Sequence, residues 1–598
     1  MDVMKPVSSA AIPASDEWLY EVKYDGFRCV LYWDKHDVRL VSKNKKDLTA
    51  RFPEIVAYCQ SQQKLMEPFL PLTLDGELVV LNHPYQANFS WIQKRSRLKN
   101  EKSIQKAKDV RPACLMVFDL LRENGENLVR KPFYVRKQRL ANICQKIPNK
   151  RIRFVKVYEN PDALWKMLFD YKGEGIVAKQ KNSVYQPAKK HRDWLKRKNW
   201  RTITGFLTRY NPQNDFFTVS VYDGESIQDI GQCKHGLDAV SFAAVKQLFM
   251  TKGTKRNGLL TLPPAICALV HTLDLYKGTF REPKFARLAL DTSPSTCTIE
   301  QLRLDMAMIP ERVNVSNTEK LFWPQTELTK GDLLIYIREM APYMLPFLKE
   351  RALTLIRCPD GVEAESFFQK HLPDYAPNFI EGIKQGDNRS MICNDLDSLI
   401  WFANHGAVEY HVPFQKVDSN KPMEIAFDLD PPNRERFDLA IQASLLIKQM
   451  LDELDLVSFV KTSGNKGLQV HIPIPEHSMT YGETGIFTAS VARTIEAAYP
   501  DLFTTERLKK KRGGRLYIDY VQHGMNKTLV APYSPRKTDE ATVATPLFWN
   551  EVSEGLDPRL FTIENVIERV QDVGCPFAAY VEAKQEQRLA KLFDLLDS

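Results

Sequence analysis

The sequence contains a lysine whose surroundings suit nucleotidyl transfer. Lys23 begins the hexapeptide KYDGFR, and four further segments follow in order: DGEL (Asp75 to Leu78), FDLL (Phe118 to Leu121), EGIVAK (Glu174 to Lys179) and WLKRK (Trp194 to Lys198). A lysine amine attacks the α-phosphorus of a nucleoside triphosphate only after losing its proton, and its reference pKa is about 10.4. Cationic neighbours and a bound metal ion would lower that pKa. We therefore expect Lys23 to form a lysine–AMP intermediate.

The other segments supply the charges that this chemistry needs. Arg28, Lys196 and Lys198 are the cations expected near the nucleophile, and Glu77 and Glu174 are the candidate metal-binding carboxylates. Negative charge gathers on phosphoryl oxygens in the transition state, which favours fixed cations and a carboxylate-held Mg²⁺. Each segment alone would equally fit a solvated lysine, a turn or a surface glutamate. Five segments in this order favour one active site.

Residues 1 to about 290 resemble the ATP-dependent DNA ligases. The resemblance implies a nucleotidyltransferase domain followed by an OB-fold barrel, with ATP as the nucleotide and Glu174 at the metal. It implies Arg28 and Glu77 at the ribose and Phe118 against adenine. It also implies that Lys196 and Lys198 bind the α-phosphate. The full set expected around the nucleotide is Glu21, Arg28, Glu77, Phe118, Lys179, Lys196 and Lys198.

Two segments depart from the family pattern. The usual Ser-Arg-Asn-Gly reads SKNK (Ser42 to Lys45), which bears on nucleotide positioning. The arginine-rich closing motif of the barrel is reduced to FREPKF (Phe280 to Phe285), which bears on domain closure.

The composition indicates a globular, multidomain protein with an uneven charge. With 598 residues, 43% of them apolar, the chain should fold into about three domains. No apolar run reaches the roughly 18 to 20 residues of a membrane span, and the N-terminus lacks a signal-peptide pattern. Ten cysteines without a CxxC pair suit reduced thiols, so we expect a cytoplasmic protein working at the bacterial nucleoid. Residues 1–300 carry a net charge of +19 and the remainder −10. We therefore expect the first half of the chain to bind the phosphate backbone of a nucleic acid.

The order of patterns along the chain predicts the domains. Alternating β-branched stretches and helical patterns predict an α+β adenylation domain over residues 1–200. Short strands with turns predict the OB-fold over 201–290. The polar, Pro-containing DTSPSTCT places a linker at 291–305. The rest, 306–598, is expected to be one further domain.

A second set of carboxylates lies in that last domain. Asp428 and Asp430 are two apart in the strand-like EIAFDLDPP, so their side chains should point to the same side. LYIDYV offers Asp519 as a third carboxylate. Three aspartates from two apposed strands could hold the two divalent ions, Mg²⁺ or Mn²⁺, of nucleotidyl transfer to a primer 3′-hydroxyl. Taken alone, DLDP would more often be a strand end followed by a turn.

The segment between these strands favours the catalytic interpretation. KTSGNKGLQV (Lys461 to Val470) is a Gly-rich loop with Ser463 and Lys466, able to bind phosphates. With DLDP before it and YIDY after it, the region resembles the archaeo-eukaryotic primase superfamily, in particular the polymerase domain of bacterial ligase D, whose catalytic core is RRM-like. That family's loop commonly ends in a His that touches the triphosphate, whereas this chain has Gln469.

The resemblance extends over residues 306–598. It implies that Lys320 and Lys330 bind a 5′-phosphate at a recessed or gapped DNA end, and that Phe367 and Phe368 stack on the template. A core role is the alternative for the two phenylalanines. The remaining residues expected near the incoming nucleotide are His411 and Arg536.

The combined pattern predicts a ligase–polymerase that joins broken DNA ends. Its expected substrates are DNA ends and gapped or nicked duplexes with a 5′-phosphate, with ribonucleotides favoured for filling and a Ku-type end-binding protein as partner. An RNA ligase or capping enzyme remains an alternative, because KxDG serves those reactions too. An end-bridging scaffold with an inactive polymerase half is an alternative from another class.

Overall fold

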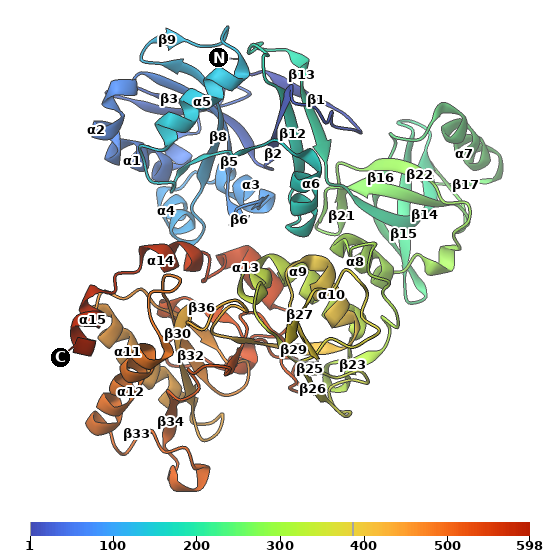
Figure 1. Cartoon of the computed structure of the whole chain (residues 1–598). Helices are drawn as coiled ribbons and strands as arrows, with labels where there is room; N and C mark the ends of the chain where they lie inside the picture. Colours follow the sequence, from blue (N-terminus) through green and yellow to red (C-terminus); the bar gives the residue numbers. More distant parts are fainter. Residues whose placement is uncertain (1, 386–387, 598) are drawn as a thin grey trace. The chain divides into compact units, whose positions relative to one another are not determined.

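The computed structural model describes residues 2–385 and 388–597 and divides into two compact units. The N-terminal unit contains the chain as far as residue 308 together with 571–573, and the C-terminal unit contains 309–570 and the residues from 574 onward. Both units mix helices with sheets, which confirms the expected α+β, multidomain class (Figure 1). In the part of the chain that is described, no helix is long and apolar enough to cross a membrane.

Two sheets form the first part of the N-terminal unit. The five-stranded sheet runs in the order β1 (Lys5–Ser8), β13 (Lys190–Lys198), β12 (Gly175–Gln180), β2 (Trp18–Val22), β11 (Val157–Tyr158). The six-stranded sheet runs β10 (Ile152–Phe154), β8 (Cys114–Glu123), β5 (Leu72–Val79), β3 (Phe27–Trp33), β4 (Val38–Ser42), with β9 (Glu126–Asn127) beside β8. All pairs are antiparallel except β1 with β13 and β10 with β8.

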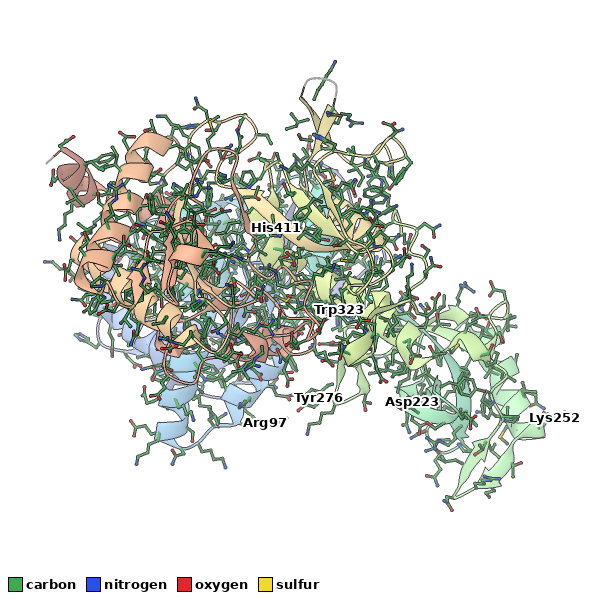
Figure 2. All side chains as sticks on the ribbon, turned by 90° about the horizontal axis from the view of Figure 1, so that it is seen from below. Arg97, Asp223, Lys252, Tyr276, Trp323 and His411 are labelled. Carbon is green, nitrogen blue, oxygen red and sulfur yellow. The ribbon has the colours of Figure 1, made fainter. Side chains whose placement is uncertain are left out.

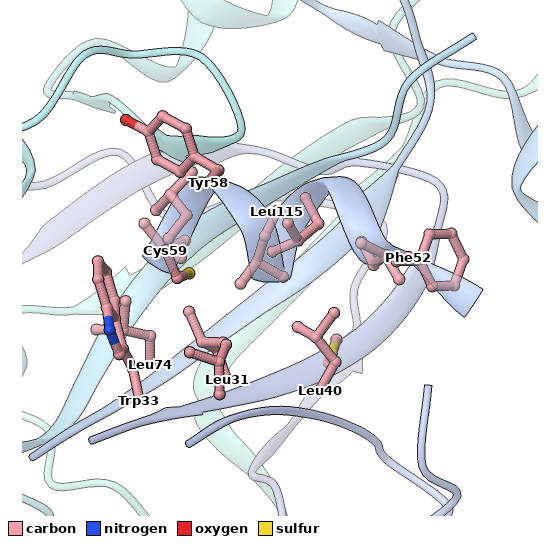
Figure 3. Packing of buried hydrophobic residues seen from close by; sticks show 14 of the residues in the cluster. Leu31, Trp33, Leu40, Phe52, Tyr58, Cys59, Leu74 and Leu115 are labelled. Carbon is pink, nitrogen blue, oxygen red and sulfur yellow. The ribbon is translucent and has the colours of Figure 1, made fainter. Parts of the chain in front are cut away.

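The main core of this part lies against one face of the six-stranded sheet. In β3, the alternate side chains of Cys29, Leu31 and Trp33 are fully or almost fully buried, as expected for a strand with one face in a core. Figure 3 shows Leu31 and Trp33 below the helix that carries Cys59. The helices of this part are α1 (Pro53–Ser61), α2 (Gln63–Met66), α3 (Phe89–Arg97), α4 (Glu101–Val110), α5 (Phe133–Cys144) and α6 (Pro161–Asp170). A short hairpin consists of β6 (Leu81–His83) and β7 (Gln86–Ala87).

A strand-rich barrel follows in the same unit. Its strands are β14 (Arg201–Asn211), β15 (Phe216–Asp223), β16 (Ser226–Cys233), β17 (Thr254–Arg256), β18 (Leu259–Thr261), β19 (Cys267–Thr272) and β22 (Lys284–Leu288). The hairpin of β20 (Asp274–Tyr276) and β21 (Thr279–Arg281) and the helix α7 (Ala239–Lys252) complete it. Figure 2 labels Asp223 at the end of β15 and Lys252 at the end of α7.

The segment expected to be a linker at 291–305 is instead largely folded. The Thr298 hydroxyl accepts a hydrogen bond from the backbone N–H of Gln301 and starts the helix α8 (Ile299–Ala307). Cys297 and Leu302 are buried in the barrel core, so the segment closes the barrel. Polar residues at a helix start resemble loop residues in sequence, which is why the sequence predicts a linker where the structure has α8.

The C-terminal unit contains two larger sheets. The six-stranded sheet runs β33 (Phe503–Thr504), β34 (Leu516–Asp519), β30 (Glu424–Asp430), β32 (Leu468–Pro473), β31 (Phe459–Thr462), β36 (Pro546–Leu547). The four-stranded sheet runs β26 (Phe367–Gln369), β25 (Thr354–Arg357), β29 (Ala407–Pro413), β35 (Thr528–Val530). Two further hairpins are β23 (Leu321–Trp323) with β24 (Leu328–Thr329), and β27 (Gly382–Gln385) with β28 (Asn388–Met391).

Helices cover these sheets. Thr329 and Asp332 form a capping box at the start of the long helix α9, which explains where that helix begins. The helices are α9 (Lys330–Leu348), α10 (Leu396–Asn404), α11 (Phe437–Glu453), α12 (Tyr481–Ala498), α13 (Val566–Val573), α14 (Tyr580–Glu586) and α15 (Ala590–Asp597).

Candidate functional sites

A cavity of about 710 Å³ in the N-terminal unit brings together most of the residues predicted around the first nucleotide. The two sheets supply them: Glu21 lies on β2 and Lys23 directly follows it, and each of the others lies on a strand of its own. The predicted residues that line it are Glu21, Lys23, Arg28, Glu77, Phe118, Lys179 and Lys196. Gly26 is needed beside the nucleophile, since a Cβ there would come 2.3 Å from the carbonyl oxygen of Leu78.

Lys23 is held by an ion pair that the sequence did not reveal. Its Nζ lies 2.5 Å from Oε1 of Glu174, and both side chains are largely buried. Burial alone would lower the pKa of Lys23, but the Glu174 carboxylate and, further away, Glu77 raise the pKa above its ordinary value. The expectation of a lowered pKa is therefore wrong for this state, because the nearest charge is negative. The amine becomes a nucleophile only when Glu174 is drawn elsewhere or takes its proton.

Arg28 is anchored by a carboxylate that sequence reasoning missed. Its Nε and Nη2 donate to the two oxygens of Asp75 at 2.6 Å each, and the Tyr185 hydroxyl donates to Asp75 at 2.7 Å. The guanidinium also lies 4.4 Å from the ring centroid of Phe118. Asp75 begins the DGEL segment, so the motif was visible in the sequence while its partner was not. Burial raises the pKa of Glu77 to about 7 despite Arg28, so this carboxyl is only partly ionised near neutral pH.

A fully buried charged cluster forms another wall of the cavity. Glu21 makes ion pairs with two lysines, with Lys179 Nζ at 2.7 Å and Lys137 Nζ at 2.6 Å. Lys179 also lies 4.3 Å from the centroid of Phe118 and 4.2 Å from that of Trp194. Burial lowers the pKa of Lys179 to about 8. Polar groups beside aromatic faces can bind a flat, hydrogen-bonding ring. Lys137 lies outside every recognised motif.

In the C-terminal unit, the structure brings two of the three predicted aspartates together. Asp428 of β30 lies directly opposite Asp519 of β34. Asp430 is instead neutralised, because Lys466 lies 2.8 Å from one of its oxygens and Arg512 2.9 Å from the other. Within residues 2–385 and 388–597, no three acidic, His or Cys side chains converge as a metal site. The expected triad is thus incomplete here, since cations compete for Asp430.

The pair of carboxylates fits a divalent ion. Burial raises the pKa of Asp428 to about 6, and the nearby Asp519 and Asp430 raise it further against a hydrogen bond from Gln469. Asp519 accepts from the Tyr517 hydroxyl at 3.0 Å. A buried carboxyl beside two others lacks a countercharge, which a bound cation supplies.

A smaller cavity, about 220 Å³, adjoins these carboxylates. The predicted residues that line it are His411, Asp428, Asp430, Ser463, Lys466, Gln469 and Arg536. The Gly-rich loop bends at Gly464, whose φ is +71° and whose added Cβ would come 2.6 Å from Arg536. Arg536 donates to the Ser463 carbonyl at 2.5 Å, which fixes this loop.

His411 lies beside a carboxylate that no motif indicated. Its Nε2 is 2.8 Å from Glu409, which also pairs with Arg536 at 3.1 Å. Although burial opposes it, the hydrogen bond with His411 and the charge of Arg536 lower the pKa of Glu409 to about 2. Glu409 therefore orients two residues at the cavity wall. Figure 2 labels His411 among the side chains of the C-terminal unit.

Comparison with known proteins establishes the family. Residues 3–198 match the family described as ATP dependent DNA ligase domain, and residues 329–577 match the one described as LigD, primase-polymerase domain. The chain is 40% identical over 603 residues to the bifunctional non-homologous end joining protein LigD of Bacillus subtilis, and the match covers 99% of both chains. The chain belongs to the LigD family.

A more distant LigD relative and a solved LigD polymerase domain also match. The multifunctional non-homologous end joining protein LigD of Pseudomonas aeruginosa is 24% identical, with 96% of this chain and 71% of that protein covered. The polymerase domain from Mycobacterium tuberculosis ligase D, solved in complex with DNA, is 28% identical and matches with a TM-score of 0.42, covering 46% of this chain and all of that one. This LigD protein is therefore a bifunctional enzyme, an ATP-dependent DNA ligase joined to a primase-polymerase.

The reduced closing motif of the LigD barrel still contacts the ligase segments. Arg281 makes a two-point ion pair with Asp25 of KYDGFR, and Glu282 lies 2.5 Å from Lys198. Lys198 is not among the residues that line the cavity, whereas the sequence motifs predicted it at the α-phosphate. Two of the three charged residues in FREPKF, Arg281 and Glu282, make these contacts.

The residues expected to bind DNA ends lie in the C-terminal unit of the LigD chain. The backbone N–H of Lys330 donates to the carbonyl of Lys320 at 2.7 Å, so the two lysines are neighbours. Lys320 pairs with Asp360 at 2.5 Å, and Lys330 donates to the Ser316 carbonyl at 2.6 Å. Burial, and then Lys320, lower the pKa of Lys330.

Two aromatic side chains of β26 are open to solvent. Phe367 is 47% exposed and Phe368 is 77% exposed. A core role is therefore excluded for both. Large apolar rings held on a strand and facing water suit a stacking partner.

Proposed function

We propose that this LigD protein repairs double-strand breaks by non-homologous end joining. The polymerase part fills or extends the ends, with ribonucleotides favoured, and the ligase part seals the remaining nick. The observation that carries this proposal is the presence in one chain of two cavities with complementary chemistry. The first cavity is lined by Lys23, by further cationic side chains and by the aromatic ring of Phe118. The second is lined by Asp428 and by the Gly-rich loop with Ser463 and Lys466, which could bind phosphate.

In the ligase cavity, Lys23 attacks the α-phosphorus of ATP, so an N–P bond forms and pyrophosphate leaves. Glu174 Oε1, 2.5 Å away, holds the ammonium and is the nearest acceptor for its proton. Lys196 borders the cavity as the cation for the α-phosphate, and Phe118 supplies the face for adenine. Glu77 and Glu174 would hold a divalent ion, which supplies charge neutralisation on the phosphates.

After self-adenylylation, the ligase passes AMP to the 5′-phosphate of a nick. The 3′-hydroxyl then attacks that phosphate, and AMP leaves as the phosphodiester bond forms. The lysine adduct is consumed in the transfer step, so sealing of a pre-adenylylated nick needs no new attack by Lys23.

Beside the polymerase cavity, Asp428 and its neighbour Asp519 would hold divalent metal, Mg²⁺ or Mn²⁺, which would lower the pKa of the primer hydroxyl and neutralise the triphosphate. Asp430 joins them once it leaves Lys466 and Arg512. The displaced Lys466 is then free to pair with phosphate. Ser463 and Arg536 hold the loop against the triphosphate, and His411 borders the same space.

The DNA substrates follow from the charges and exposed rings. Lys320 and Lys330 would bind a terminal 5′-phosphate, since ammonium groups pair strongly with phosphate. Phe367 and Phe368 would stack on template bases. A Ku-type end-binding protein is the proposed partner, and DNA repair places the work at the bacterial nucleoid.

One assay tests the proposal. The full-length protein is incubated with labelled ATP, then with gapped DNA carrying a 5′-phosphate and NTPs, and adduct, extension and sealing are measured. Lys23→Ala should lose the adduct and nick sealing but keep extension, whereas Asp428→Ala should lose extension but keep the adduct. A Lys23→Ala protein that still acquires covalent AMP would contradict the ligase assignment. Stimulation of joining by an added Ku-type protein tests the partner.

A further inference from the structure

Four side chains form a row across the six-stranded sheet of the C-terminal unit. In the pairing register, Lys461 of β31 lies opposite Gln469 of β32, Gln469 opposite Asp428 of β30, and Asp428 opposite Asp519 of β34. Directly opposed residues in antiparallel strands project from the same face, so their side chains can touch in sequence. The row therefore connects a lysine to both proposed metal carboxylates.

Lys461 and Gln469, at one end of the row, are buried, and the hydrogen bonds run from Lys461 through Gln469 to Asp428. Lys461 is completely buried and Gln469 is 3% exposed. Lys461 Nζ donates to Gln469 Oε1, and Gln469 Nε2 donates to Asp428 Oδ1 at 3.0 Å. The remaining contact of Lys461 is weak, a 3.5 Å approach to the Thr462 carbonyl.

Both ends of the row favour this direction. An amide offers one acceptor and one donor group, while an amine with its N–H groups presents donors. Lys461 therefore fixes Oε1 of Gln469 toward itself, which leaves Nε2 facing the Asp428 carboxylate. The Asp428 carboxylate, which only accepts, favours the same orientation, so a donor at one end and an acceptor at the other hold the amide together.

We propose that Lys461 is a positioning residue of the polymerase site, which acts through the amide of Gln469 to hold Asp428 in the orientation that binds a divalent ion. The inference rests on the proposed metal role of Asp428. It also gives a reason for a glutamine at this position of the sequence, because an amide can accept from the lysine and donate to the carboxylate at once.

The test measures metal binding directly, with no need for turnover. Free Mn²⁺ is followed by electron paramagnetic resonance during titration of full-length protein, and Asp428→Ala defines the binding that belongs to other sites. Lys461→Met removes the donor but keeps the length of the side chain. Lys584→Met is the matched control, because Lys584 pairs with Glu476 at 2.9 Å outside the sheet row.

We expect Lys461→Met to weaken the Asp428-dependent Mn²⁺ binding by about tenfold, equivalent to about 1.4 kcal/mol, and Lys584→Met to leave it unchanged. Gln469→Leu should cause a similar loss, and the double variant should lose no more than either single one, since both act through one hydrogen-bonded path. Thermal unfolding of each variant reports whether the C-terminal unit is folded.

Three results would overturn the proposal: unchanged Mn²⁺ binding in Lys461→Met, tighter binding from relief of charge repulsion, or additive losses in the double variant. If Lys461→Met does not fold, the test relies on Gln469→Leu. Normal Mn²⁺ binding by Gln469→Leu would refute the proposed action of Lys461 through Gln469 on Asp428. If Asp428→Ala itself binds Mn²⁺ like the unaltered protein, the metal site of the proposed function fails, and the proposal for Lys461 fails with it.

Discussion

The Lys23–Glu174 ion pair predicts how the nucleophile responds to pH. Attack needs the neutral amine, and Glu174 raises the pKa of Lys23 above its ordinary value. At an ordinary pKa of about 10.4, only about one amine in a thousand is neutral at pH 7.5, so the fraction here is smaller still. Below the pKa, the neutral fraction grows about tenfold for each pH unit. In Glu174→Gln the opposing charge disappears while burial remains, so the pKa should fall.

The assay measures the reactivity of the Lys23 amine in the absence of ATP and metal. Any loss of metal binding in the variant therefore does not interfere. The protein is treated with an amine-acylating reagent across pH 7 to 11, and labelling of Lys23 is quantified by peptide mass spectrometry. Lys255, an exposed lysine on β17, reports the intrinsic pH dependence of the reagent. We expect the Lys23 profile to lie at higher pH than that of Lys255 in the unaltered protein, and to move to lower pH in Glu174→Gln.

The matched control is Glu67→Gln, whose partner Lys35 lies 3.5 Å away in an exposed pair. It should leave the Lys23 profile unchanged, because exposed pairs are weak and this one is elsewhere on the surface. If the Lys23 profile in Glu174→Gln stays in place or moves to higher pH, Glu174 does not hold the ammonium and the reasoning is refuted.

Three further predictions follow from burial and charge. Asp119 and Arg136 form a fully buried two-point pair at 2.7 and 2.8 Å, so Asp119→Ala should destabilise the N-terminal unit by about 3–5 kcal/mol in denaturant unfolding, and a loss under 1 kcal/mol would contradict the buried charge. Phe368→Ala should leave unfolding unchanged but weaken template binding by about 1–3 kcal/mol in fluorescence anisotropy, and equal affinity would exclude stacking. Lys320→Ala/Lys330→Ala should weaken binding of 5′-phosphorylated gapped DNA by roughly tenfold while 5′-hydroxyl DNA binds as before; equal losses on both substrates would indicate a general basic patch.

Local patterns in the sequence were sufficient for several parts of the molecule. The β-branched and aromatic segment around Asp428 forms a strand as expected, because strand preference depends on neighbouring residues. The prediction of a linker at 291–305 rested on the same kind of local information. Thr298 looks like a loop residue until its hydroxyl caps α8, and only packing against the barrel makes that helix stable.

The sequence by itself determined which chemistry-bearing residues the chain carries, their order and their family. The tertiary structure decided which charges meet. Lys23 and Glu174 are 151 residues apart, and Lys461 reaches Asp428 only through a register shared by three strands. Such pairings depend on sheet order and on burial, which the whole fold sets, and burial in turn controls pKa values and hydrogen-bond direction. For that reason the motifs predicted the sites, while their protonation and their positioning partners required the folded chain.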